Sequence, residues 1–239
     1  MNRYIIFPFT LFFLFIILFG IYASDNEFFK KGLEYYQNND FQLAAAHFEE
    51  AKRVDPDESL TYFYLGNSYY QLNDLDNAIM NFTAGLNFTD NKGVFFYNLG
   101  NCYYLKGNYD FSTEMYSKAV LNDPALYDSY LNAGTAYYKI EDYAKTIVQW
   151  ETYLKKYPET PQYVKIEKAI AYLRGELSSP DSSKPDSSKT GINEKTGLLD
   201  EDLLGDILSD LEELIKRTEN VMEISEAPID DLSSEEIER

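Results

Sequence analysis

The sequence predicts an all-α protein whose body is a solenoid of four stacked helix–turn–helix repeats. Three observations predict it: a constant spacing of glycines, a helical period of apolar residues, and turn-forming residues between the helices. Gly32, Gly66, Gly100 and Gly134 follow one another at intervals of 34 residues. A fixed period of this size indicates a repeat protein, because no single unit can bury its apolar face and stacking supplies the core.

The residues around the glycine indicate which face of the first helix is packed in each repeat. In the second repeat, Tyr62, Leu65, Gly66 and Tyr69 are spaced at i, i+3, i+4 and i+7, which places them on one face of a helix. The glycine lies on this face, where a larger side chain would hold the paired helix away. The second helix carries an aromatic residue 16 positions after each glycine, namely Phe48, Phe82, Tyr116 or Trp150.

Turn residues separate the helices of each repeat. Three repeats have Asn39, Asn73 or Gly107 at the turn, residue types that tolerate a left-handed backbone. Glu141 takes this place in the fourth repeat, so we expect that turn to be the most strained or differently shaped. Second helices should stop before Pro56, Pro124 and Pro158, because the residue before proline avoids the helical region.

Four in-register copies of this pattern resemble the tetratricopeptide repeat (TPR) family over residues 25–158. The copies span about 25–58, 59–92, 93–126 and 127–160. Departures from the family pattern are local: Lys31 and Ala133 precede their glycines in place of leucine, Gly85 replaces an alanine, and Asp90 replaces the last proline of its repeat. The resemblance implies a curved array whose first helices line a concave groove, where peptide ligands of the family lie.

Twelve residues on the first helices are the candidate groove positions that the resemblance implies. They are Phe29, Leu33, Tyr36, Phe63, Asn67, Tyr70, Tyr97, Asn101, Tyr104, Leu131, Thr135 and Tyr138. Tyrosine offers apolar area with a polar tip, and asparagine offers a donor and an acceptor to a peptide backbone. On this assignment Tyr70 and Tyr104 face the groove, and their neighbours Tyr69 and Tyr103 lie in the core. The alternative is that some of these tyrosines only pack between helices.

The repeats are flanked by segments of other kinds. Residues 1–24 combine Arg3 with a long apolar run and the small residue Ala23, which predicts a signal peptide or an uncleaved N-terminal membrane anchor. Either one places the body outside the cytoplasm: periplasmic, envelope-associated or secreted. After the last repeat, residues 161–175 predict a capping helix with Thr160 as its N-cap.

The C-terminal part is predicted to be a linker followed by an acidic tail. Residues 176–198 are rich in Ser, Pro, Asp and Lys, which is typical of a disordered linker. Within the tail 199–239, leucines and isoleucines form an apolar stripe over about 200–217, with acidic residues on the other face. This helix can fold back on the repeats or dock on a partner, and the sequence leaves both open.

Composition excludes several classes of protein. Forty acidic residues against 21 basic ones disfavour binding to nucleic acid. One His and one Cys leave no ligand cluster for a metal and no cysteine protease arrangement. We expect Cys102 to be a small buried residue and His47 to be solvated, and we find no cofactor-binding motif.

The sequence therefore predicts a non-enzymatic scaffold or adaptor, without cofactor or metal, that binds a peptide segment of another protein. The alternative is a self-assembling envelope component, in which the tail helix docks in its own or a neighbour's groove. The partner's identity is not encoded in any motif. Membrane contact is expected only through the N-terminal segment.

Overall fold

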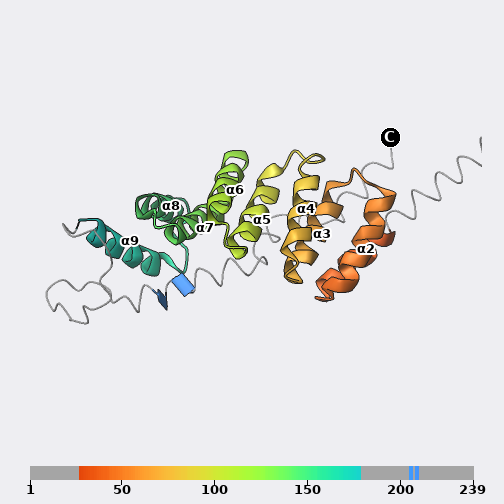
Figure 1. The fold of residues 1–239 in the computed structure, drawn as a ribbon, viewed down its shortest axis with the longest axis horizontal. Helices are drawn as coiled ribbons and strands as arrows, with labels where there is room; N and C mark the ends of the chain where they lie inside the picture. The colour runs from red at the N-terminus through yellow and green to blue at the C-terminus, as the bar shows by residue number, and fades with distance from the viewer. Residues whose placement is uncertain (1–26, 179–204, 207, 210–239) are drawn as a thin grey trace, which may run out of the picture. The chain divides into compact units, whose positions relative to one another are not determined.

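The computed structural model describes residues 27–178, 205–206 and 208–209, and among these residues it contains helices and turns but no β-strand (Figure 1). The predicted all-α solenoid class is confirmed. The N-terminal segment 1–24, most of the predicted linker and most of the acidic tail lie outside the described residues. The predictions made for those segments stay predictions.

The chain divides into two compact units, Met1–Asp90 and Asn91–Arg239. The first unit contains a helix over residues 27–37, then α2 (Phe41–Val54), α3 (Ser59–Gln71) and α4 (Leu75–Gly85). The second contains α5 (Lys92–Leu105), α6 (Tyr109–Asn122), α7 (Tyr127–Lys139), α8 (Tyr143–Lys156) and α9 (Tyr163–Ser178). Each unit therefore holds two predicted repeats, and the second also holds the predicted capping helix.

The turn inside each of the four repeats has the same left-handed backbone conformation. Asn39, Asn73, Gly107 and Glu141 all have positive φ, between 57° and 75°. The amide of Asn39 donates to the Tyr36 carbonyl, and the following amide donates to the Tyr35 carbonyl, the pattern of a Schellman motif. Glu141 has φ 61°, so the turn of the fourth repeat has the same shape as the others, with a residue type that rarely adopts positive φ. That it is the most strained of the four stays a prediction.

Prolines end the second helices as predicted in three repeats. The last helix-capping residues, Asp55, Asp123 and Tyr157, have extended φ between −125° and −138° immediately before a proline. Repeat two lacks this proline, and α4 there is 11 residues long where α2, α6 and α8 have 14. The capping helix begins at Tyr163 and runs to Ser178, so it starts and ends later than the predicted 161–175.

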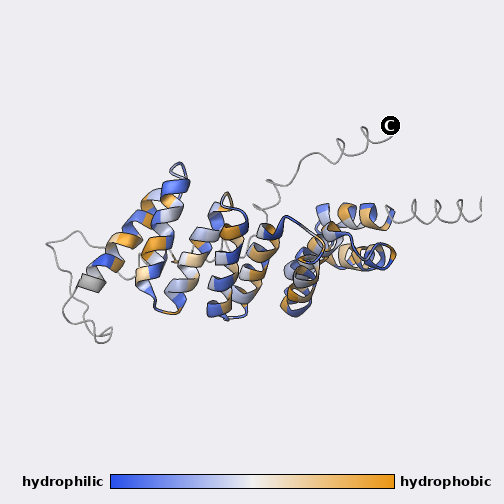
Figure 2. Ribbon diagram, turned by 90° about the horizontal axis from the view of Figure 1, so that it is seen from above, coloured by the Kyte–Doolittle hydropathy of each residue, from blue (hydrophilic) through white to orange (hydrophobic). Residues whose placement is uncertain are grey.

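The glycine of each first helix meets the aromatic ring of the second helix. A Cβ on Gly66 would lie 2.6 Å from Phe82 Cε1, and one on Gly100 would lie 2.5 Å from Tyr116 Cε1. The rings of Phe82 and Tyr116 are fully buried. Figure 2 shows hydrophobic and hydrophilic residues interspersed along the helices. The close approach therefore explains the 34-residue recurrence of glycine.

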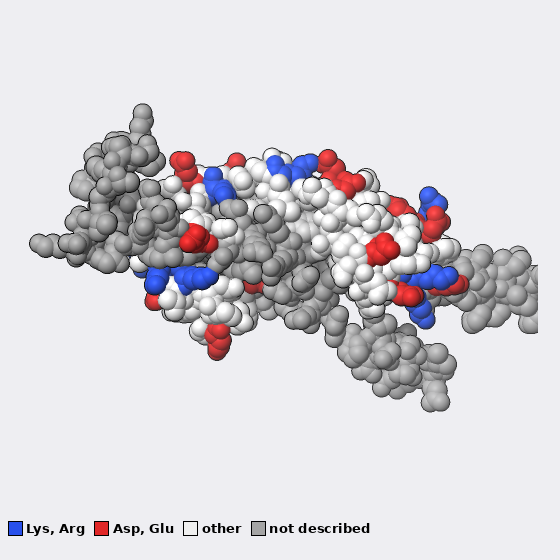
Figure 3. All heavy atoms as spheres, turned by 90° about the horizontal axis from the view of Figure 1, so that it is seen from below, with Lys and Arg blue, Asp and Glu red and all other residues white. Residues whose placement is uncertain are grey.

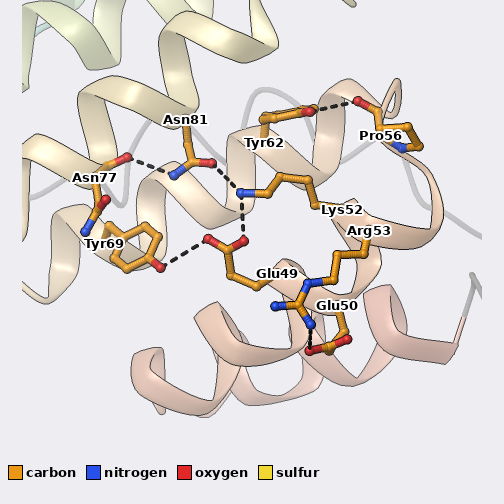
Figure 4. A network of polar contacts seen from close by, with 9 residues as sticks. All are labelled: Glu49, Glu50, Lys52, Arg53, Pro56, Tyr62, Tyr69, Asn77 and Asn81. Atoms are coloured by element: carbon orange, nitrogen blue, oxygen red, sulfur yellow. Dashed lines mark hydrogen bonds and ion pairs between the residues drawn. The ribbon is translucent and has the colours of Figure 1, made fainter.

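A partly exposed polar network joins the helices of the first unit (Figure 4). Lys52 Nζ lies 2.7 Å from Glu49 Oε2 and donates to Asn81 Oδ1 at 3.3 Å. The Tyr69 hydroxyl donates to Glu49 Oε1 at 3.2 Å. Asn81 also donates to the Asn77 carbonyl at 2.8 Å. These contacts connect α2, α3 and α4 through one ion pair.

Candidate functional site

The structure places all twelve candidate groove residues on the first helices of their repeats, but most of them are buried. Phe29, Leu33, Tyr36 and Tyr138 are half-buried. The other eight are no more than 5% exposed: Phe63, Asn67, Tyr70, Tyr97, Asn101, Tyr104, Leu131 and Thr135. Binding by the twelve residues stays a prediction, and in this conformation the side chains of these eight are covered.

The assignment of the paired tyrosines is wrong. Tyr70 and Tyr104 are each 5% exposed, whereas Tyr69 and Tyr103 are half-buried. The Tyr104 ring packs edge-on against Tyr109, the first residue of the following helix, with centroids 5.2 Å apart. The Tyr103 ring instead stacks on Phe111, which is exposed.

The same packing across the turn recurs in other repeats. Tyr36 meets Phe41 at 5.3 Å, and Tyr138 meets Tyr143 at 5.5 Å, always five residues apart. The start of the second helix therefore packs on the second tyrosine in the first, third and fourth repeats, and of these three tyrosines Tyr104 is the buried one. Helical periodicity separates the two tyrosines by 100° but does not say which neighbouring element covers either one.

A buried polar cluster surrounds Asn101 in the second unit. Asn101 Oδ1 accepts hydrogen bonds from the Tyr116 hydroxyl at 2.6 Å and from Asn132 Nδ2 at 3.2 Å. Asn132 Nδ2 also lies 3.2 Å from the Tyr97 hydroxyl oxygen, to which it donates. These residues come from α5, α6 and α7, so a single acceptor ties three consecutive helices together.

Sequence reasoning missed Asn132, although a signal was present. Asn98 and Asn132 each stand two residues before the glycine of their repeat, a recurrence confined to the third and fourth repeats. Both side chains are buried, at 2% and 3% exposure. Asn132 takes part in the hydrogen-bond network around Asn101, whereas Nδ2 of Asn98 has no hydrogen-bond partner within the described residues.

Two asparagines at the same repeat position have a buried donor that nothing satisfies. Nδ2 of Asn67 and Nδ2 of Asn101 are buried and have no hydrogen-bond partner within the described residues. Leaving such a donor unpaired costs about 1–3 kcal/mol. Both groups lie 34 residues apart in the sequence, on α3 and α5. A further acceptor would stabilise either amide, and in the second unit Nδ2 of Asn98 also has no hydrogen-bond partner within the described residues.

One carboxylate and two phenols of the second unit have raised pKa values. Burial raises the pKa of Asp128, at the start of α7. Burial first, and then the charge of Asp128, raise the pKa of Tyr97 far above its ordinary value. Burial likewise raises the pKa of Tyr153 to about 12, against the opposing effect of its hydrogen bond to Thr160. Both phenols are therefore neutral at physiological pH.

The two residues singled out for possible chemistry have structural surroundings. Cys102 is fully buried, as predicted, and burial raises the pKa of its thiol, so the thiolate is disfavoured. His47 is half-buried rather than solvated, and its ring stacks on Tyr35 with centroids 5.1 Å apart. In the part of the chain that the structure describes, no three His, Cys, Asp or Glu side chains form a metal-binding group.

Charge on the surface is mixed in sign. On the face drawn in Figure 3, basic side chains adjoin acidic ones in small groups, with uncharged surface between them. Several ion pairs of the described residues join helical neighbours, such as Lys118 with Glu114 and Lys145 with Asp142, each 2.7 Å apart. Pairs of this kind contribute little to stability and offer no extended basic field to a polyanion.

The repeated helix pairs and the glycine–ring contacts inside them define an α-helical repeat protein of the solenoid class. The chain belongs to the tetratricopeptide repeat family. Models described as "Tetratricopeptide repeat" match residues 29–82, 95–126 and 128–160. These matches cover parts of all four predicted repeats.

Solved structures of MamA share the fold. The structure titled "Crystal structure of MamA protein" has a TM-score of 0.59 at 16% identity, covering 64% of this chain and 83% of that one. A second, "Crystal structure of MamA", has a TM-score of 0.56 at 15% identity, covering 80% and 96%. A MamA double mutant has a TM-score of 0.59 at 15% identity, covering 80% and 95%. At these identities the likeness concerns the fold alone.

A comparison with curated proteins and a search of the described residues for membrane-spanning helices each found nothing. No curated protein matches the chain. Across residues 27–178 and the described pieces of the tail, no helix combines the length and apolarity needed to cross a membrane. The predicted N-terminal segment lies outside this range.

Proposed function

We propose that this protein is a non-enzymatic scaffold or adaptor that holds a peptide segment of another protein against the first helices of its repeats. The observation that carries the proposal is the recurrence of Asn67 and Asn101 at one repeat position, each with a buried, unpaired Nδ2 donor. Membership of the TPR family, whose repeats serve as protein-interaction scaffolds, supports the same role.

The chemistry of binding follows from the side chains around these donors. A peptide backbone carbonyl placed at Asn67 or Asn101 would accept the hydrogen bond that the amide lacks, removing an unfavourable desolvation cost. Rings on the same helices, such as Phe63 and Tyr97, would supply apolar contact area. Because these groups are covered in the present conformation, binding requires the covering groups to move aside.

Comparison of two tyrosines on α7 tests the proposal. Tyr138 is a half-buried candidate groove residue, whereas Tyr127 is 38% exposed and stacks on Tyr157. The intact protein, Tyr138→Ala and Tyr127→Ala would each be immobilised and exposed to the envelope fraction of the source cells, with captured proteins identified by mass spectrometry. We expect Tyr138→Ala alone to lose a partner, with a loss of roughly 2 kcal/mol if it is a hot spot.

Thermal unfolding of both variants provides the control for that capture experiment. Equal melting temperatures would attribute a lost partner to the binding surface rather than to misfolding. If Tyr127→Ala loses the same partner, or if neither variant loses any, the first helices are not the binding surface. The candidate groove assignment would then be abandoned.

We also propose that the body acts outside the cytoplasm, tethered or released. Arg3 followed by the apolar run of the first 24 residues supports this location. Protease added to spheroplasts, or to intact cells of another kind of host, should digest the protein while a cytoplasmic marker survives. Equal protection of the two would contradict export. Mass spectrometry of the N-terminus would separate cleavage after Ala23 from an intact anchor.

A further inference from the structure

Among the described residues of the acidic tail, which are 205, 206, 208 and 209, Leu208 is buried in the second unit. Leu208 is 8% exposed and belongs to the hydrophobic cluster that contains Leu131 of α7, Trp150 of α8, and Ile166 and Ile170 of α9. Its neighbours Asp206 and Ser209 are exposed. Burial on one side and exposure on the other is the pattern of an amphipathic helix resting on an apolar surface.

We propose that the tail segment 199–217 is an intramolecular ligand of the second unit, anchored by Leu208. Leu131 is a candidate groove residue and shares the cluster with Leu208. The tail therefore occupies part of the surface assigned to partner segments and competes with them. This inference concerns the chain's own tail and holds whether or not the proposed partner binding is correct.

The apolar stripe of the tail continues on both sides of Leu208. Leu204, Leu208, Leu211 and Ile215 recur at intervals of three or four residues, which is the spacing of one helix face. An isolated helix of this length is marginal in water, so it needs an apolar surface for stability. The cluster around Leu208 supplies such a surface.

The connecting chain is long enough for the tail to return to the unit from which it leaves. Residues 179–204 separate the end of α9 from Gly205. If this segment is the disordered linker that its composition predicts, its root-mean-square span is roughly 25–30 Å. The 16-residue α9 is about 24 Å long. Return to the α7–α9 surface therefore needs no extended linker.

Charge also favours docking of the tail at the α8–α9 end of the repeats. Residues 139–175, which contain α8 and most of α9, carry seven basic and five acidic side chains. Residues 27–138 carry seven basic and fifteen acidic ones. The tail segment 199–217 has seven acidic and two basic residues. The acidic tail is thus attracted to the α8–α9 end of the repeats, the part of the body with a net positive charge.

Tethering gives the tail a large advantage over a ligand in solution. A segment on a short flexible linker has an effective concentration of about 1 mM near its site. If the free segment binds with a dissociation constant of about 0.1 mM, the tether weakens a competing ligand roughly tenfold. A partner must therefore bind tightly, or the tail must be released first.

A labelled synthetic peptide of residues 199–217 tests the proposal with the intact chain. Fluorescence anisotropy would measure its binding to the unchanged protein, to Leu208→Asp and to the matched control Ser209→Asp, which alters an exposed neighbour. We expect Leu208→Asp to bind the peptide roughly tenfold more tightly than the other two, because its own tail no longer covers the site. Leu208→Ala provides a milder variant, and circular dichroism verifies that each variant is folded.

Three results would overturn the proposal. The first is no peptide binding to folded Leu208→Asp or Leu208→Ala. The second is equal binding to all forms. The third is a concentration-dependent oligomer of the unchanged protein that Leu208→Asp abolishes in sedimentation experiments, because the tail would then dock in a second copy rather than its own. Hydrogen exchange adds an independent readout: α9 amides should be protected in the intact chain and less protected in Leu208→Asp.

Discussion

Each unit contains a polar network that joins three consecutive helices, but the two networks differ in charge and burial. In the first unit, Glu49 and Lys52 form an ion pair whose side chains are 30% and 22% exposed. In the second, the centre is Asn101, fully buried and neutral, which accepts from Tyr116 and Asn132. The same helix–turn–helix repeat thus accommodates either a solvated charged link or a buried neutral one.

This difference predicts which network contributes more to the stability of its unit. Partly exposed ion pairs contribute about 0–1 kcal/mol and are screened by salt. Buried hydrogen bonds contribute about 0.5–1.5 kcal/mol each, and an orphaned partner costs more. The position equivalent to Tyr116 is Phe82 in the first unit, which has no hydroxyl to donate. The buried network therefore depends on one oxygen atom that the other unit lacks.

The largest expected effect tests a feature that both units share. Tyr70→Ala and Tyr104→Ala should each lower the free energy of unfolding by about 3–5 kcal/mol, because both rings are buried. Tyr69→Ala and Tyr103→Ala should cost about 1 kcal/mol, because their rings are half-exposed. Urea unfolding followed by circular dichroism measures all four. A larger loss for Tyr103→Ala than for Tyr104→Ala would restore the opposite assignment.

The glycine–ring contact should also behave alike in the two units. Gly66→Val and Gly100→Val place atoms against Phe82 and Tyr116, and each should cost about 1–3 kcal/mol. Gly205→Ala serves as the control, since a Cβ there meets nothing within 4 Å. Thermal unfolding would reveal the cost. Tolerance of valine in one unit and not the other would mean that the two repeats pack differently.

Removal of the Tyr116 hydroxyl tests the contribution of the buried network to stability. Tyr116→Phe should lower the free energy of unfolding by about 0.5–1.5 kcal/mol, because Asn101 loses its shortest hydrogen bond. Tyr157→Phe is a matched control on a partly exposed ring and should change stability by less than about 0.5 kcal/mol. Chemical denaturation of both variants measures the two losses in the free energy of unfolding. Equal effects would show that the hydroxyl of Tyr116 adds nothing specific.

The charged network of the first unit should have a smaller effect that depends on salt. Lys52→Met should cost less than about 1 kcal/mol at low ionic strength and almost nothing in 1 M salt, where the Debye length is about 3 Å. The cost of Tyr116→Phe should not change with salt. Denaturation at two ionic strengths compares the variants. A salt-independent loss for Lys52→Met would mean that its contact with Asn81, rather than its charge, stabilises the unit.

The smallest expected effect concerns the pH dependence of the second unit. Burial raises the pKa of Asp128 in the folded protein above its ordinary value of 3.8. Ionisation of Asp128 therefore opposes folding: its contribution is most favourable below pH 3.8 and is lost as the pH rises through the raised pKa. Asp128→Asn should accordingly match the unchanged protein at low pH and gain relative stability at neutral pH. A relative stability that does not vary with pH would contradict this burial.

Sequence patterns predicted the fold in detail but the candidate site only in outline. The left-handed turns at Asn73 and Glu141 were predictable because few backbone conformations close a tight turn between antiparallel helices. The burial of Cys102 followed from its place on the packed face. The burial of Tyr104 did not follow, because it depends on Tyr109 in the next helix.

The sequence by itself determined the repeat, its turns and the helix ends, since the 34-residue period, the turn residues and the prolines act over a few neighbouring positions. Only the tertiary structure decided which tyrosines are covered, which asparagines meet around Tyr116, and that Leu208 is buried beside α7 to α9. The physical reason is that periodicity fixes the direction of a side chain around its own helix axis. Burial and hydrogen bonding depend on what other elements bring to that side, from positions far away in the chain.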